Sequence, residues 1–292
     1  MIRPKLITAL GDPGIYIGER EYLEAGEFEF LVPQAVRRLH VCCVGAGGLY
    51  DGQSYYSGGG GALAWANGVK VEPGEKLKIV VGAPWARGGQ PGDSAIYRVE
   101  EPENEEDDPI ETMLVKAGGG VAPQGGQFSF GTNADGSNIN GGGGNGGNGA
   151  YRTDLTSGGY YYASGLGGGG GAGGYRGNGG RANGGAPDAG SGGGSAGTGY
   201  YFDNSGLTTG TYPGREGGGV GIKGQGSDGP SPGIQPAETP ARPGNPGSGG
   251  DGAKFGGGGG GGNAANAGGG AVRIIWGNKF SYPDNADIEA VE

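Results

Sequence analysis

The chain has 292 residues, and 80 of them are glycine, roughly four times the share found in an ordinary soluble domain. It carries 20 Lys and Arg residues against 30 Asp and Glu residues, which gives a formal net charge of −10. Nucleic-acid binding depends on cations that neutralise phosphates, and no cluster of Lys and Arg occurs, so the composition argues against a nucleic-acid partner.

Two further absences concern membranes and export. No stretch approaches the ~18 apolar residues of a membrane span, so we expect no membrane insertion. The N-terminal residues Met1–Leu6 carry charge but are not followed by an apolar run of signal-peptide length. We therefore expect the protein to be made in a cytoplasm and to stay there, or to leave it inside an assembled particle.

Residues 1–26 mix charged and apolar side chains and contain turn signals around Gly11–Gly14. We interpret them as an arm outside the core that attaches the protein to another subunit. Residues 27–117 then alternate in polarity with a period of two, which is typical of strands. They predict a small antiparallel β-sandwich with strands at Glu27–Val32, Val36–Val44, Ala62–Ala66, Val69–Val71, Lys76–Val81, Ser94–Val99 and Glu111–Ala117.

The predicted strand Val36–Val44 is apolar on both faces, which is typical of a central strand covered on both sides. Its adjacent Cys42 and Cys43 point to opposite faces, and a disulfide between them would need a strained turn. We expect two reduced, buried thiols. The single histidine, His40, lies in the same strand, where a structural role is favoured over a catalytic triad. We expect no metal, no cofactor and no catalytic residue.

The segment Glu100–Asp108 is a block of acidic residues between two predicted strands. Such a block repels itself and is normally a solvated loop. A calcium site is the alternative, because oxygen-rich loops suit that ion, although the Asp-x-Asp-x-Asp-Gly spacing is absent.

From 118 to 270 the chain is dominated by glycine, with runs such as Gly141–Gly144 and Gly167–Gly171 that show no strand or helix pattern. An extended helix with three residues per turn makes no internal hydrogen bonds, so glycine-rich copies can pack until their N–H and C=O groups pair with one another. We therefore expect residues 118–270 to form a domain of packed polyglycine-II-type helices inserted into the sandwich. Residues 271–292 supply a closing strand, in which Val272, Ile274 and Trp276 share a core with Phe28, Phe30 and Leu77.

Tyrosine-rich interruptions separate the glycine runs, and we expect them to be turns at the ends of the helices. Tyr combined with Ser, Gly and Asn is also the composition of antibody-like binding loops. The alternative is that the rings only cap the helix bundle. The candidate receptor-contact residues are Tyr160, Tyr161, Tyr162, Tyr200, Tyr201, Phe202 and Tyr212.

The segments Leu39–Gly48, Val71–Gly82 and Gly268–Gly277 resemble the glycine-rich domains of tailed-phage virion proteins, such as tail fibres and tip adhesins. The likeness spans about Glu27 to Pro283. It implies a jelly-roll-like sandwich carrying polyglycine helices, a location in the virion and partners among other virion proteins. Because fibre proteins are often trimeric, a homotrimer is one assembly that the resemblance implies.

Three functions are open at this point. The first is a tail-fibre or tip protein that binds a receptor on the host surface, and the second is a purely architectural protein of the collar, baseplate or tail. The third is a polysaccharide-cleaving fibre enzyme, which would need a pair of carboxylates that sequence spacing does not reveal. We favour a non-enzymatic virion role, which the first two share.

Overall fold

The computed structural model of the chain describes residues 6–8, 16–49, 56–84, 92–102, 104, 106, 108–150, 169–182, 217–225, 255–258 and 267–287. These residues form two antiparallel sheets and no helix, which confirms the all-β class expected from the sequence. Consequently, this part of the chain contains no helical segment with the length and apolarity that a membrane span requires.

The first sheet has six strands in the order β1-β2-β11-β4-β5-β10. Its strands come from both ends of the chain, because β11 lies between β2 and β4 and pairs with both. The bounds are Leu6–Thr8 for β1, Tyr16–Tyr22 for β2, Ala271–Trp276 for β11, Arg38–Val44 for β4, Leu63–Lys70 for β5 and Gly141–Gly144 for β10.

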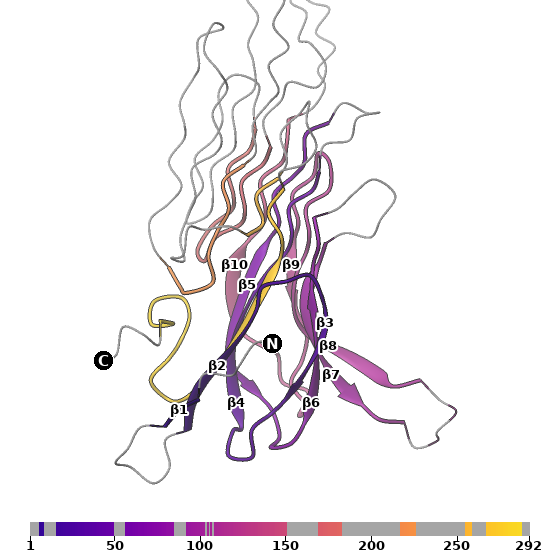
Figure 1. The fold of residues 1–292 in the computed structure, drawn as a ribbon, viewed down its shortest axis with the longest axis vertical. Coiled ribbons are helices and arrows are strands. Elements are labelled where there is room, and N and C mark those ends of the chain that lie inside the picture. The colour runs from indigo at the N-terminus through magenta and orange to yellow at the C-terminus, as the bar shows by residue number, and fades with distance from the viewer. Residues whose placement is uncertain are drawn as a thin grey trace, which may run out of the picture.

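The second sheet has five strands in the order β3-β6-β7-β8-β9. Figure 1 shows that the β7–β8 hairpin projects away from the body of the sandwich at the end opposite the glycine-rich segments. The bounds are Gly26–Leu31 for β3, Lys76–Val81 for β6, Ser94–Glu100 for β7, Ile110–Ala117 for β8 and Phe128–Phe130 for β9.

The core between the sheets is built from the inward side chains of both. Val272, Ile274 and Trp276 of β11 are buried in it together with Phe30 and Leu77, and Phe28 packs against it. The rings of Phe30 and Trp276 lie 5.8 Å apart between their centroids. This confirms the expectation that the last apolar segment completes the core begun by the first strands.

A second core covers the outer face of the six-stranded sheet. Cys42 and Val44, on the other face of β4, lie in it with Ile275 of β11, Tyr175 from the glycine-rich region and Tyr282 from the C-terminal segment. β4 is thus covered on both sides, as its two apolar faces predict. Cys42 and Cys43 are unpaired, fully buried and on opposite faces, which confirms the expectation for the thiols.

Three sequence expectations are wrong. Tyr16–Tyr22 form β2 inside the sheet, with Tyr22 only 3% exposed, although residues 1–26 were expected to form an arm outside the core. The expected strands at Ala62–Ala66 and Val69–Val71 are the single strand β5, because Asn67 and Gly68 (φ +67°) make a bulge that keeps the pairing continuous. Gly141–Gly144, expected to be neither strand nor helix, pairs with β5 as β10.

Candidate functional site: a glycine lattice and the polar network that holds it

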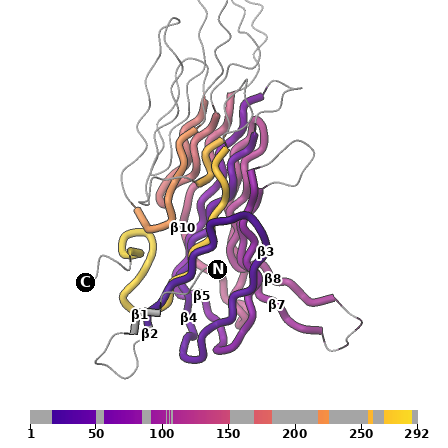
Figure 2. Tube along the Cα trace, viewed as in Figure 1, coloured from indigo at the N-terminus to yellow at the C-terminus, as the bar shows by residue number. Residues whose placement is uncertain are grey.

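Glycine-rich segments continue beyond the ends of several strands and run side by side along the long axis of the molecule (Figures 1 and 2). We call them the glycine lattice. They belong to both halves of the sequence, so the lattice is not confined to residues 118–270. Its members are residues 45–48, 58–61, 118–120, 125–126, 146–149, 169–174, 177–180, 217–219 and 256–258.

The segment 58–61, together with Ala62, is the most enclosed part of the lattice. Its backbone N–H and C=O groups bond at 2.7–3.0 Å to six other segments, namely 45–48, 118–120, 125–126, 146–149, 169–174 and 256–258. Buried backbone groups require such partners. Here every neighbour supplies them through its main chain, so hydrogen bonds between backbones hold the segments where side chains are absent.

The bonds within the lattice repeat every three residues. Gly170 donates to the carbonyl of Gly58 and Gly173 donates to the carbonyl of Gly61, so both partners advance by three. In the same way Gly45 donates to Ala62 and Gly48 donates to Gly59. A β-ladder would repeat every two residues, whereas an extended helix of the polyproline type repeats every three.

Contact between backbones excludes a side chain at many glycine positions of the lattice. A Cβ atom on Gly60 would lie 1.9 Å from the carbonyl oxygen of Gly171, and one on Gly146 would lie 1.8 Å from that of Gly60. Both distances are far inside van der Waals contact. The high glycine content is therefore a packing requirement of these segments.

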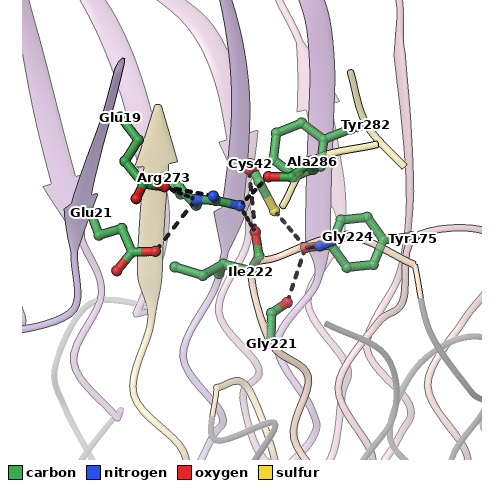
Figure 3. A network of polar contacts seen from close by, with 10 residues as sticks. All are labelled: Glu19, Glu21, Cys42, Tyr175, Gly221, Ile222, Gly224, Arg273, Tyr282 and Ala286. Atoms are coloured by element: carbon green, nitrogen blue, oxygen red, sulfur yellow. Dashed lines mark hydrogen bonds and ion pairs between the residues drawn. The ribbon is translucent and has the colours of Figure 1, made fainter. Parts of the chain in front are cut away.

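A buried arginine anchors the lattice and the C-terminal segment to the outer face of the six-stranded sheet (Figure 3). Arg273 of β11 is 1% exposed. Its Nη2 and Nε lie 2.6 and 3.0 Å from Glu19 Oε2, and Nε lies 3.4 Å from Glu21 Oε1. Its Nη1 donates to the carbonyls of Ala286 and Ile222 at 2.7 and 3.3 Å. One guanidinium thus ties together β2, β11, the C-terminal segment and the segment around Ile222.

The electrostatics of this arginine follow from its burial and partners. Desolvation lowers the pKa of Arg273, but Tyr282 and the carboxylates of Glu19 and Glu21 outweigh it and raise the pKa above its ordinary value. The guanidinium therefore stays charged, as a buried cation with two carboxylate neighbours should.

Tyr175 holds the lattice next to this arginine. It is 1% exposed, its hydroxyl donates to the carbonyl of Gly221 at 3.1 Å, and the same oxygen accepts the N–H of Gly224. Its ring stacks on that of Tyr282 with centroids 5.9 Å apart, and Cys42 Sγ lies 3.5 Å from its hydroxyl. Burial raises the pKa of the Cys42 thiol to about 12, so this cysteine is a packing residue rather than a nucleophile.

His40 belongs to the same polar network. Asn67 Oδ1 accepts the N–H of Tyr282, and Asn67 Nδ2 donates to the carbonyl of Tyr282. The contact of 2.9 Å between His40 Nδ1 and Asn67 Oδ1 therefore makes Nδ1 the protonated nitrogen. His40 is only half-buried, but its structural role agrees with the sequence interpretation.

The sequence analysis did not single out Arg273, Glu19, Glu21 or Tyr175. A charged residue inside the apolar run Ala271–Trp276 was the available signal for Arg273, since such a residue needs a partner. Tyr175 is an aromatic residue within a glycine run, yet it is buried against the sheet. An aromatic interruption of glycine is therefore not always an exposed turn.

All seven candidate receptor-contact residues, from Tyr160 to Tyr212, lie outside the described residues. The described residues that flank them lie close together in the lattice. Ala150 and Ala182 contact one another, Gly217 donates to the carbonyl of Gly258, and Gly258 donates to that of Gly170. The intervals 151–168 and 183–216 therefore begin and end in one part of the lattice.

Of the acidic block, Glu100, Glu101, Asn104, Glu106 and Asp108 are described and exposed, and Glu101 Oε1 lies 3.3 Å from Lys76 Nζ. Within the described residues, no three His, Cys, Asp or Glu side chains gather as a metal site would require.

In the comparisons with known proteins, neither a family model nor a curated protein matches this chain.

Proposed function

We propose that the chain is a structural, non-enzymatic component of a tailed-phage particle, a tail-fibre or tip protein that takes part in binding a host-surface receptor. In this proposal a jelly-roll-like sandwich carries polyglycine-II-type helices, whose Tyr-rich turns contact the receptor. The alternative is a purely architectural role in the collar, baseplate or tail.

The observation that carries the proposal is the lattice, with its repeat of three residues and its exclusion of side chains at positions such as Gly60 and Gly146. What the lattice offers is a stiff support, because each buried segment is held by several others. Functional residues commonly lie on loops positioned by a rigid scaffold.

The proposal is also supported by the proximity of the residues that flank the two tyrosine-bearing intervals, 151–168 and 183–216. Ala150, Ala182, Gly217 and Gly258 bring the ends of the two tyrosine-bearing intervals into one part of the lattice. Rings carried by both intervals would then share one contact surface. Tyr is enriched among interface residues that dominate binding energy.

The test replaces Tyr161 and Tyr201 by Ala and measures adsorption of assembled particles to host cells. We expect adsorption to weaken by roughly 30-fold or more, corresponding to about 2 kcal/mol for the loss of interface hot spots, while particle assembly is unchanged. Tyr97→Ala is the matched control, because Tyr97 is a partly exposed tyrosine of β7 in the sandwich.

Each other outcome selects a different role. If assembly fails while the purified variant stays folded, these tyrosines face another virion protein, and the architectural role is correct. If neither adsorption nor assembly changes, the rings only cap the lattice and the receptor-contact proposal is wrong.

A further inference from the structure

A hollow of about 810 Å³ lies at the end of the sandwich away from the lattice. It is formed by the β3–β4 connection, the β5–β6 turn, the end of β7 and the turn at Ala134 and Asp135. Two of its charged groups are cations without a partner, because no ion pair or hydrogen bond of the Arg37 and Arg38 side chains occurs among the described residues. Both side chains are exposed.

The other two cations of the hollow, Arg98 and Lys70, already have ion-pair partners. Arg98 is 5% exposed, and its Nε pairs with Glu75 Oε1 while its Nη2 donates to the carbonyl of Lys70 at 2.9 Å. Lys70 Nζ pairs with Asp135 Oδ2 at 2.5 Å. Two carboxylates of the hollow, Glu75 and Asp135, are thus committed to these partners.

Arg38 is also placed against another cation. It pairs in register with Lys70 across β4 and β5, and like charges directly opposite on neighbouring strands repel one another. Asp135 pairs with Lys70 and Glu75 pairs with Arg98, so Arg37 and Arg38 are the cations of the hollow that have no ion-pair partner among the described residues. An acidic ligand would relieve this repulsion, even though Glu72 and Glu100 also line the hollow.

The chain itself carries a segment with the complementary chemistry. The tip of the β7–β8 hairpin holds seven carboxylates in the nine residues Glu100–Asp108. Glu106 and Asp108 are exposed, and the adjoining Ile110 is 60% exposed. An exposed apolar side chain of this kind suits the partly exposed Pro73, which also lines the hollow.

The β7–β8 hairpin contributes Glu100 to the lining of its own hollow, pairs Glu100 in register with Ile110, and projects away from the body of the sandwich (Figure 1). We propose that the hollow with Arg37 and Arg38 receives the acidic β7–β8 hairpin of a second copy of this chain. Such a contact joins two different surfaces, so it builds a reciprocal two-fold dimer, a larger closed ring or a filament.

Sedimentation equilibrium of the full chain tests this contact. At low salt we expect assemblies heavier than the 28.7 kDa chain. Association should weaken by about tenfold or more in about 0.5 M salt, because charges on exposed groups are screened there. A chain that stays monomeric at every concentration and salt would overturn the proposal.

Charge reversal on each side identifies the occupant. Arg37→Glu with Arg38→Glu, and separately Glu106→Arg with Asp108→Arg, should each give monomers with an unchanged far-ultraviolet circular dichroism spectrum. All four substitutions together should restore association. Lys279→Glu with Arg181→Glu is the matched control, since both side chains are exposed elsewhere, and it should associate like the native chain.

Two results contradict the pairing. If the hairpin variant associates like the native chain while the arginine variant does not, the hollow takes a different acidic partner. If the four-fold variant stays folded but does not associate, the hairpin and the hollow do not meet.

Discussion

Gly60 shows what the lattice demands of a single residue. Its N–H donates to the carbonyl of Gly147 at 2.8 Å, and its own carbonyl accepts from Gly126 at 2.8 Å. A methyl group on residue 60 would lie 1.9 Å from the carbonyl oxygen of Gly171, and neither segment can move away without breaking its own backbone hydrogen bonds. Glycine loses more conformational entropy on folding than other residues, but no larger residue fits at this position.

We therefore expect Gly60→Ala to lower the free energy of unfolding by about 1–3 kcal/mol, as overpacking of a tight core does. Gly269→Ala is the matched control, because a Cβ atom there would have open space within 4 Å. Urea unfolding followed by tryptophan fluorescence measures both. Equal stability of the two variants would show that the lattice yields at Gly60.

The buried thiols make stability depend on pH in the alkaline range. Burial raises the pKa of Cys42 from 9.0 to about 12 and raises that of Cys43 well above its ordinary value. At a pH between the ordinary and the raised pKa, the thiols lose their protons in the unfolded chain but keep them in the folded chain. The free energy of unfolding therefore falls as the pH rises. The stabilisation is complete below pH 9.0 and disappears toward pH 12.

Chemical unfolding at pH 8 and pH 11 should show this loss, on the order of 2–3 kcal/mol for Cys42 alone. Cys42→Ala should have a shallower decline over the same range, because its share of the proton linkage is removed. Identical declines for the variant and the native chain would assign the effect to other groups, of which the buried Cys43, Tyr175 and Tyr282 are the candidates.

At the scale of elements, the sequence predicted most of the strands that have a clear alternation of polarity. β3, β4, β6, β7, β8 and β11 occur within one or two residues of the expected ranges. β10 was missed because Gly141–Gly144 has no side chains and so no alternation. β2 was missed because Glu19, Arg20 and Glu21 resemble a solvated arm, and the partner of the two glutamates is Arg273, some 250 residues later.

The sequence predicted the type of packing in the glycine lattice but not which segments take part in it. Its composition pointed to pairing between backbones, but glycine runs carry no pattern that specifies which segments meet. The contributions of residues 45–48 and 58–61 depend on where β4 ends and β5 begins, which is a property of the folded sandwich. The polar network around Arg273 joins four distant segments for the same reason.

Hydrogen exchange tests whether the lattice segments are ordered in solution. The amides of Gly146, Gly147 and Gly170–Gly174 donate to other segments, so we expect them to exchange far more slowly than unprotected amides. The exposed connection Leu23–Ala25 provides the fast reference. Rapid exchange throughout residues 141–149 and 169–174 would mean that the lattice does not persist.

At the scale of the whole molecule, the sandwich and the lattice form one structure that β11 completes. β11 lies between β2 and β4, and its two faces supply side chains to both cores. The residues after it, Phe280 and Tyr282, cover the outer face of the same sheet. The two ends of the chain therefore depend on each other for stability.

Truncation after Gly270 should accordingly abolish cooperative unfolding of the remaining chain. It removes Val272, Ile274 and Trp276 from the inner core, and single deletions of such side chains already cost about 2–5 kcal/mol. Truncation after Asp287 is the control and should melt like the full chain. Thermal unfolding followed by circular dichroism distinguishes them, and a normal melt for residues 1–270 would show that the halves are independent.

The repeat of three residues also limits how this protein can change in length. In an extended helix with about three residues per turn, one inserted residue turns every following group by about a third of a revolution. An insertion within 169–174 would thus point the N–H of Gly173 away from Gly61 and toward the wrong neighbour. Insertions and deletions inside the lattice segments should therefore be tolerated in steps of three residues, so that homologous chains keep the phase of each segment while the intervals between segments vary freely.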